Sequence, residues 1–241
     1  MLSSAVANAQ VVDGFQPFTC KPENRNPMSY RLFVPENPGK ENLPLIVHFH
    51  GAGSRGNDNL KQITWTKCFA TKEMQARHPC FILAPQCPDP LRWVDTDWAL
   101  LKHQMPPITA EMQNAVEIIE EVLAKYPVDR RRIYLTGQSM GGFAVWDILC
   151  RRPDLFAAAV PVCGGGDESK APLIKDIPIW AFHGAKDPTV KVERSRNMIE
   201  ALKKAGGAPL YTEYPDVEHS AWVPAYKEEK LPDWLFGQTK P

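Results

Sequence analysis

The pentapeptide GQSMG at positions 137–141 holds a serine between two glycines. The apolar run Ile133–Thr136 before it is predicted to be a strand, and Phe143–Cys150 after it is predicted to be a helix. A serine in a sharp strand-to-helix turn projects its hydroxyl above the sheet, where it can attack a substrate. Glycines suit the flanking positions because a Cβ there would collide with the neighbouring strand or helix. The pattern predicts that Ser139 is a nucleophile. The alternative is a glycine-rich turn in which the serine is incidental.

A serine hydroxyl needs a base within hydrogen-bond reach, and that base needs an acid to orient it. In proteins with this kind of turn the three groups follow one another as serine, acid, histidine. Asp187 follows the predicted strand Ile177–Phe182, and His219 follows the predicted strand Leu210–Tyr214. The sequence therefore predicts that Ser139, Asp187 and His219 act as nucleophile, acid and base.

Rival residues fit these roles less well. Four other histidines either lie in or at the end of predicted strands, where packing is expected, or have no matching acid: His48, His183, His78 and His103. Two acids beside His219 lie on the wrong loop for the role: Asp216 and Glu218. Asp187 is therefore the favoured acid, with an ordinary Asp-Pro turn as its alternative interpretation.

The segment HGAGSRG at positions 50–56 is a glycine-rich loop after the predicted strand Leu43–Phe49. A tetrahedral intermediate needs two N–H donors aimed at its oxyanion. We expect one from the backbone of Met140 and the other from Ala52, with Gly53 as the alternative to Ala52. The loop lacks the lysine and the glycine spacing of phosphate-binding loops, so phosphate binding is a weaker interpretation.

No cofactor or metal is expected. His48 and His50 point to the same face of a predicted strand, which is one way to build a metal pair, but no third ligand is evident.

The 241 residues suit one large α/β domain. The 28 basic residues balance the 28 acidic ones and form no basic stripe, so nucleic acid and anionic membranes are not expected partners. No apolar run reaches the roughly 18 residues that a membrane span requires. The oligomeric state stays open.

Apolar runs alternate with helical patterns along most of the chain. The expected strands are Tyr30–Pro35, Leu43–Phe49, Phe81–Pro85, Ile133–Thr136, Ala157–Val162, Ile177–Phe182 and Leu210–Tyr214. The expected helices are Thr66–Arg77, Thr109–Tyr126, Phe143–Cys150, Val192–Ala205 and Pro224–Phe236. This alternation predicts an α/β fold with a mostly parallel central sheet and helices on both faces. We expect a single catalytic domain at residues 29–241, without a separate lid domain because the stretch from 163 to 176 is too short for one.

Residues 1–28 are expected to form a leader and an irregular segment before the first strand. Ala7-Asn8-Ala9 resembles a signal-peptidase site, but no basic or apolar region precedes it. A signal-peptide remnant and a plain disordered leader are equally good interpretations. The remnant favours a secreted or periplasmic protein; otherwise the protein is cytoplasmic.

The six cysteines are expected to be free and partly buried. Cys80 and Cys87 bracket an extended strand, which puts their Cα atoms on the order of 20 Å apart, beyond the reach of a disulfide. Cys150 and Cys163 are expected at opposite ends of their elements. Long-range pairs that involve Cys20 or Cys68 stay open.

The loop from 86 to 107 is long and rich in tryptophan, and we expect it to form one wall of the site. Trp93 or Trp98 is expected to face the substrate, with Trp222 as a second wall. Arg55 and Gln138 complete the expected substrate-binding set. Packing in the core is the alternative for each tryptophan, and plain solvation is the alternative for Arg55.

From about Tyr30 to Phe236 the chain resembles α/β-hydrolase carboxylesterases of the bacterial group that includes polyhydroxybutyrate depolymerases, feruloyl esterases, and dienelactone-hydrolase-like and prolyl-oligopeptidase-like hydrolases. The matching stretches are HGAGSRG at 50–56, LAPQCP at 83–88, RWVDTDW at 92–98, GQSMGG at 137–142, HGAKD at 183–187 and EH at 218–219. The resemblance implies a triad of Ser139, Asp187 and His219. The chain departs from dienelactone hydrolase itself at the strand-to-helix turn, where that enzyme has a cysteine in place of the serine.

These observations predict a serine carboxylesterase that acts on short-chain or aryl and hydroxycinnamoyl (feruloyl-type) esters through an acyl-enzyme. Its partner would be a small-molecule or polysaccharide-linked ester. The alternatives are a prolyl-oligopeptidase-like serine peptidase and a hydrolase-fold binding protein without catalysis.

Overall fold

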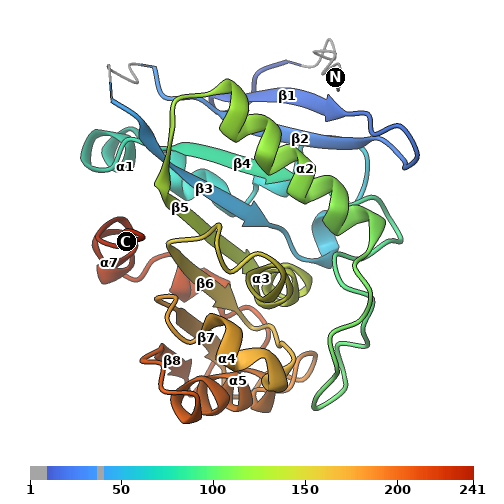
Figure 1. Cartoon of the computed structure of the whole chain (residues 1–241), viewed down its shortest axis with the longest axis vertical. Helices are drawn as coiled ribbons and strands as arrows, with labels where there is room; N and C mark the ends of the chain where they lie inside the picture. Colours follow the sequence, from blue (N-terminus) through green and yellow to red (C-terminus); the bar gives the residue numbers. More distant parts are fainter. Residues whose placement is uncertain (1–9, 37–40) are drawn as a thin grey trace.

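The computed structural model describes residues 10–36 and 41–241 (Figure 1). In this part of the chain one sheet has the strand order β1-β2-β4-β3-β5-β6-β7-β8. The strands are β1 Phe15–Cys20, β2 Met28–Phe33, β3 Leu43–Phe49, β4 Phe81–Pro85, β5 Val128–Gln138, β6 Ala158–Val162, β7 Trp180–Gly184 and β8 Leu210–Tyr214. β3 and the strands β4 to β8 pair in parallel, whereas β2 pairs antiparallel with both β1 and β4. The predicted mostly parallel sheet is confirmed.

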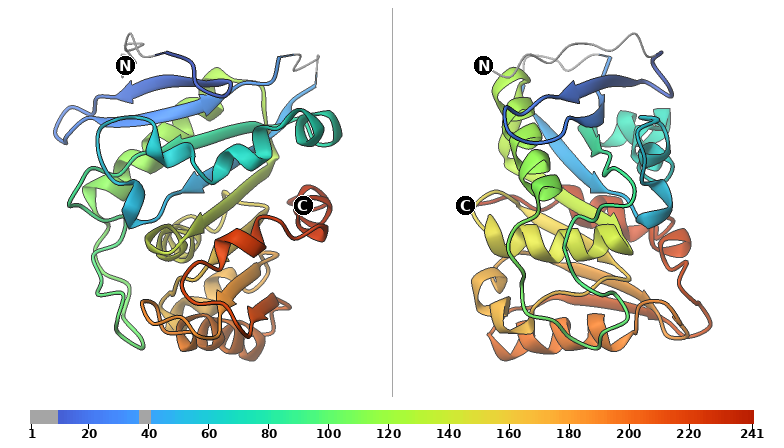
Figure 2. Two further views of the ribbon diagram at one scale, coloured as in Figure 1. Left: turned by 180° about the vertical axis from the view of Figure 1, so that it is seen from behind. Right: turned by 90° about the vertical axis from the view of Figure 1, so that its right-hand side faces the viewer.

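Helices cover both faces of this sheet (Figure 2). They are α1 Lys72–Arg77, α2 Ala110–Lys125, α3 Met140–Arg151, α4 Ala171–Ile174, α5 Glu193–Lys204, α6 Trp222–Ala225 and α7 Lys230–Phe236. The 3₁₀ turns are η1 Ala52–Ser54, η2 Lys61–Ile63, η3 Thr66–Ala70 and η4 Glu168–Lys170. One apolar core contains buried side chains of α2, α3, α4 and α5, and a second core contains those of η3, α6 and α7.

The central strand β3 shows why its sequence is apolar throughout. Leu45 and Val47 belong to the first core, and Ile46 between them belongs to the second. Successive side chains of a strand point to opposite faces, so a strand covered on both sides needs an apolar residue at nearly every position.

The prediction that residues 11–28 are irregular is wrong for Phe15–Cys20, which form β1 at the edge of the sheet. The sheet therefore begins before residue 29, where the catalytic domain was expected to start. Pro17 hides this strand in the sequence, because proline breaks the ladder of a central strand but is tolerated on an edge.

Two helices predicted as continuous are broken. The stretch from 66 to 77 forms η3 and then α1, because Thr71 is extended and its side chain caps α1 by accepting from the Met74 amide. The C-terminal helix is split into α6 and α7. Pro232 lies in the first turn of α7, where its missing N–H is harmless, whereas inside a longer helix it would remove a hydrogen bond.

The connections at the carboxyl edge of the sheet are short or anchored. Between β6 and β7 the chain forms only η4 and α4, and this stretch contains no lid domain. The long segment between β4 and α2 has no regular structure, but the Thr109 hydroxyl donates to the Trp93 carbonyl and ties the segment to the start of α2.

Ala7-Asn8-Ala9 lies outside the described residues. Among the helices of the described part, none is both long enough and apolar enough to span a membrane.

Candidate active site

Ser139 stands at the turn between β5 and α3 with φ 56° and ψ −121°. This left-handed conformation is costly for a residue with a side chain and persists only where the surroundings enforce it. A Cβ on Gly137 would lie 2.6 Å from the Phe49 carbonyl oxygen, and one on Gly141 would overlap the same carbonyl. The close approach of β3 to the turn explains both glycines, as predicted.

The three residues singled out in the sequence form a continuous hydrogen-bonded chain. Ser139 Oγ lies 2.8 Å from His219 Nε2, and His219 Nδ1 lies 2.7 Å from Asp187 Oδ2. Because the ionised carboxylate only accepts, Nδ1 carries the proton and Nε2 is left to accept from the serine hydroxyl. The chain ends at a buried acid and begins at a serine that borders a cavity.

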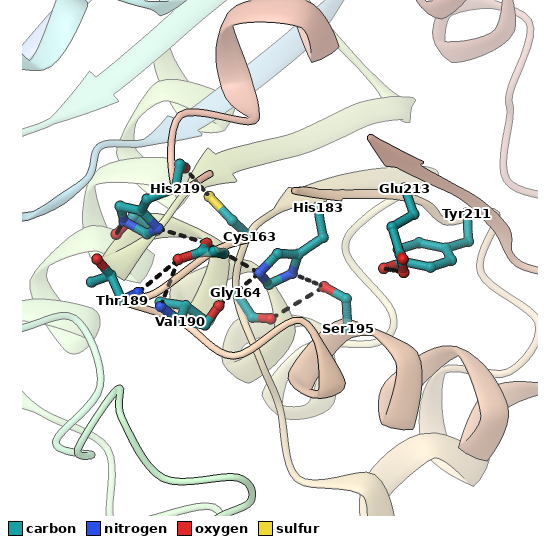
Figure 3. A network of polar contacts seen from close by, with 11 residues as sticks. Cys163, Gly164, His183, Thr189, Val190, Ser195, Tyr211, Glu213 and His219 are labelled. Carbon is teal, nitrogen blue, oxygen red and sulfur yellow. Dashed lines mark hydrogen bonds and ion pairs between the residues drawn. The ribbon is translucent and has the colours of Figure 1, made fainter. Parts of the chain in front are cut away.

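Four groups contact the Asp187 carboxylate. They belong to Thr189, Val190, His219 and His183, which are labelled in Figure 3. Oδ1 accepts from the amides of Thr189 and Val190, each at 2.9 Å. Oδ2 faces His219, and His183 Nε2 lies 3.2 Å from it. Burial alone would raise the pKa of Asp187, but the hydrogen bonds from His183, His219 and the Val190 amide outweigh it and hold the pKa well below its usual range.

The rival histidines have other partners. His48 Nε2 lies 2.9 Å from Gln138 Oε1, and burial lowers the pKa of His48 to about 3. Burial likewise lowers the pKa of His50 to about 4. The expectation that His78 has no matching acid is wrong: its Nε2 lies 2.9 Å from Asp233 Oδ1. That acid comes from α7, so sequence proximity could not reveal the pair.

His103 and His183 are engaged as well. Burial and the Arg194 guanidinium lower the pKa of His103 to about 4. His183 is completely buried and contacts Ser195 Oγ and the Val190 carbonyl, in agreement with the expected packed histidine.

The two expected oxyanion donors are backbone groups at the starts of helical segments. Ala52 is the first residue of η1, and Met140 is the first residue of α3. The N–H of a first helical residue has no acceptor inside its own helix, so it is free to bind an anion. Ala52 and Gly53 both line the cavity at Ser139.

A cavity of about 310 Å³ opens onto Ser139. Its walls are Gly51, Ala52, Gly53, Ser54, Trp65, Trp98, Gln138, Ser139, Thr189, His219 and Trp222. The expected Trp98, Trp222 and Gln138 lie in this wall. Trp65 and Thr189 were missed, because Trp65 precedes η3 without a distinguishing motif and Thr189 is polar in an ordinary turn.

Of the two tryptophans expected as alternatives for the cavity wall, Trp98 lines the cavity and Trp93 does not. Trp93 is fully buried, its indole N–H donates to the His50 carbonyl at 3.1 Å, and its ring packs edge-on against Phe49 with centroids 5.0 Å apart. The hydrogen bond to His50 anchors the start of the glycine-rich loop to this buried ring. The tryptophan spacing alone could not show which ring turns inward.

Arg55 also supports that loop and does not line the cavity. Its Nε donates to the Ala52 carbonyl at 3.0 Å, and its Nη1 donates to the Pro90 carbonyl at 2.8 Å. Its guanidinium thereby links the loop that carries Ala52 to the long segment after β4.

All six cysteines are free, as expected. In the described part of the chain, Cys163, Asp187 and His219 offer potential ligand atoms within 4.8 Å of one another. Burial raises the pKa of the Cys163 thiol well above its usual value, whereas metal binding requires a thiolate. The atoms of Asp187 and His219 that face each other are joined by a hydrogen bond, which suits acid–base chemistry.

A mostly parallel sheet with helices on both faces and a serine at a strained strand–helix turn defines an α/β hydrolase. The chain belongs to the dienelactone hydrolase family, whose profile matches residues 95–230.

Individual proteins resemble the chain over most of its length. A structure described as a thermostable esterase has a TM-score of 0.88 and 40% identity, and the match covers 95% of this chain and 64% of that one. A ferulic acid esterase superposes with a TM-score of 0.67 at 17% identity, over 92% of this chain and 98% of that one, which shows a shared fold.

A curated relative is the bifunctional acetylxylan esterase/xylanase XynS20E of Neocallimastix patriciarum, 24% identical over 192 residues. The match covers 78% of this chain and 26% of that protein, so the chain spans about a quarter of this relative's length.

Proposed function

We propose that this protein is a serine carboxylesterase in which Ser139, His219 and Asp187 are nucleophile, base and acid. The observation that carries the proposal is the unbroken chain from Ser139 Oγ to His219 Nε2 at 2.8 Å and from His219 Nδ1 to Asp187 Oδ2 at 2.7 Å. Membership of the dienelactone hydrolase family and the likeness to a thermostable esterase support ester hydrolysis.

In the first half-reaction Ser139 Oγ attacks the ester carbonyl carbon while His219 Nε2 takes the hydroxyl proton. The ionised Asp187 stabilises the imidazolium that forms and keeps its ring in place. The carbonyl oxygen becomes an oxyanion, which the backbone N–H groups of Met140 and Ala52 bind. His219 then gives its proton to the departing alkoxide, and the alcohol leaves an acyl-Ser139 ester.

The second half-reaction repeats these steps with water. His219 takes a proton from the water as it attacks the acyl carbon, and the same two amides bind the second oxyanion. Collapse of this intermediate returns the proton to Ser139 and releases the carboxylic acid.

For the substrate we propose short-chain or aryl and hydroxycinnamoyl esters. The cavity is small, and Trp98 and Trp222 give it aromatic walls that suit a planar acyl group. Trp65 also lines a neighbouring cavity of about 650 Å³, which offers room for a larger alcohol such as a sugar chain. The similarity of this chain to an acetylxylan esterase supports polysaccharide-linked esters as substrates.

The test is hydrolysis of a panel of aryl esters from acetate to long-chain acyl groups, together with methyl ferulate and acetylated xylan. Wild type is compared with Ser139→Ala and, as a matched control, with Ser220→Ala, which removes an exposed hydroxyl beside the base. We expect a preference for short-chain or feruloyl esters that Ser139→Ala loses and Ser220→Ala keeps.

Three other results would count against the proposal. Cleavage of peptide substrates without cleavage of any ester would favour the serine peptidase. No turnover and no labelling of Ser139 by a fluorophosphonate would favour a binding protein. Full activity in Ser139→Ala would contradict the assignment of the nucleophile.

A further inference from the structure

His183 lies in a network of polar contacts that also contains Ser195, Val190 and His219 (Figure 3). It belongs to β7, and its ring is completely buried. Nε2 lies 3.2 Å from Asp187 Oδ2 and 3.0 Å from the Val190 carbonyl oxygen. Nδ1 lies 2.7 Å from Oγ of Ser195 on α5, so the ring is fixed between a strand and a helix.

The neighbours of the ring determine where its proton sits. The Val190 carbonyl and the ionised Asp187 carboxylate only accept hydrogen bonds, so Nε2 must carry a proton and donate to them. In a neutral ring, Nδ1 accepts from the Ser195 hydroxyl. In a charged ring, Nδ1 donates to Ser195, whose hydroxyl then donates to the Gly164 carbonyl 3.3 Å away. In both forms Ser195 holds the ring.

The same nitrogen stabilises the turn that carries the acid. The Val190 amide donates to Asp187 Oδ1, and the Val190 carbonyl accepts from His183. His183 thus holds one carboxylate oxygen directly and the other through Val190. Without this donor, Oδ2 would keep only His219 among these contacts, and the turn would lose its anchor to β7.

We infer that His183 is a positioning residue for the proposed reaction: it holds the turn from Asp187 to Val190 so that Oδ2 faces Nδ1 of His219. The inference rests on the proposed function of the triad. Ser195 on α5, the partner of His183, extends the series of polar contacts behind the acid. The series runs from Ser195 through His183 and Asp187 to His219 and Ser139.

The charges around His183 are accounted for. Asp187 faces it from the following loop, and Glu213 is its register partner on β8. Glu213 is paired with Arg196 through two hydrogen bonds of 2.9 and 2.6 Å. Beyond Asp187 lie His219 and the Cys163 thiol.

The test compares His183→Leu, which fills the space without a donor, with His183→Gln, whose side-chain amide can replace the Nε2–H donor. Activity is divided by the fraction of Ser139 that a fluorophosphonate titrates, so that misfolded protein does not count. We expect kcat of His183→Leu to fall about 10- to 100-fold with little change in KM, because small displacements of catalytic groups cost this much. His183→Gln should recover most of the loss.

A second readout is the pH profile of kcat/KM. Because His183 positions the carboxylate that stabilises the imidazolium of His219, the acidic limb should shift in His183→Leu. Trp180→Phe is the matched control, because it removes a partly buried hydrogen bond from the same strand to Thr212 Oγ1. The control should keep both kcat and the profile.

The inference is overturned if His183→Leu keeps kcat within about twofold of wild type with an unmoved acidic limb, or if His183→Gln is no better than His183→Leu. If His183→Leu does not fold, Ser195→Ala decides: a fall in kcat at constant KM supports the inference, and wild-type kcat overturns it. These outcomes are distinct from failure of the proposed function, which activity in Ser139→Ala would reveal.

Discussion

Oδ2 of Asp187 lies 2.7 Å from Nδ1 of His219, although the two residues stand on the loops after different strands. This contact selects the tautomer in which Nε2 is free to accept from Ser139. In Asp187→Asn the amide can present its N–H₂ to Nδ1 and reverse the tautomer. We expect kcat for an aryl acetate to fall about 10³- to 10⁴-fold with a small change in KM. A fall of less than tenfold in steady-state assays would contradict the role of Asp187.

The pKa of Asp187 also makes a prediction about stability. It is depressed in the folded state relative to an ordinary value of 3.8, so the charged carboxylate stabilises the fold above about pH 4. As pH falls below that value, the unfolded chain takes up the proton first and this contribution is progressively lost. Urea unfolding between pH 5 and pH 2 (roughly the range set by the linkage) should show a shallower loss of stability in Asp187→Asn than in wild type.

The control for this experiment is Asp216→Asn, since Asp216 is an exposed acid on the loop before His219. It should follow the wild-type curve. Equal slopes for wild type and Asp187→Asn would show that the carboxylate does not titrate differently in the two states.

Gly141→Ala should prevent the turn between β5 and α3 from forming. The new Cβ would overlap the carbonyl of Phe49 in the central strand β3, and neither backbone can move without disrupting the sheet. We expect a loss of more than about 3 kcal/mol in the free energy of unfolding, above the usual cost of an overpacked core. Gly53→Ala is the matched control on the facing loop, because a Cβ there meets no atom within 4 Å. Similar stability of the two variants in urea would refute the close approach.

Substitution of Trp98 should affect substrate binding, whereas substitution of Trp93 should affect stability. Trp98→Ala removes part of the cavity wall, so KM for methyl ferulate should rise about 2- to 10-fold while KM for a small acetate ester changes little. Trp93→Ala removes a fully buried ring and should instead lower stability by about 3–5 kcal/mol. Comparison of KM for both esters with thermal unfolding separates the two roles. A feruloyl-specific KM effect in Trp93→Ala would overturn this distinction.

The cysteines should be unreactive in the folded protein. Burial raises the pKa of Cys68, Cys80 and Cys150 to about 12, and that of Cys20 to about 11. At about pH 8, just below the pKa of an ordinary thiol, almost no thiolate therefore exists. Alkylation followed by mass spectrometry should show little labelling of native protein. All six should react in urea without a reducing agent, because none forms a disulfide. Rapid native labelling or thiols that need reduction would contradict this.

Much of the fold was predictable because its signals are local. Each buried parallel strand is an apolar run, and a helix pattern separates most pairs of such strands, so the order of elements follows from the sequence. The edge strand β1 was not predictable, because Pro17 makes it look like a loop and only pairing with β2 makes it a strand. The break between α6 and α7 likewise depends on how the chain packs around Pro232.

The sequence by itself determined the strand-to-helix turn and the order of Ser139, Asp187 and His219, because glycine spacing and chain topology restrict where such residues can lie. Tertiary structure alone decided which tryptophan lines the cavity, that Asp233 is the partner of His78, and that His183 and Ser195 stand behind Asp187. These relations depend on the direction of side chains and on contacts between distant segments. Local residue patterns specify neither. They determine whether a segment is a strand, helix or loop, whereas the partner of a side chain depends on how these elements pack.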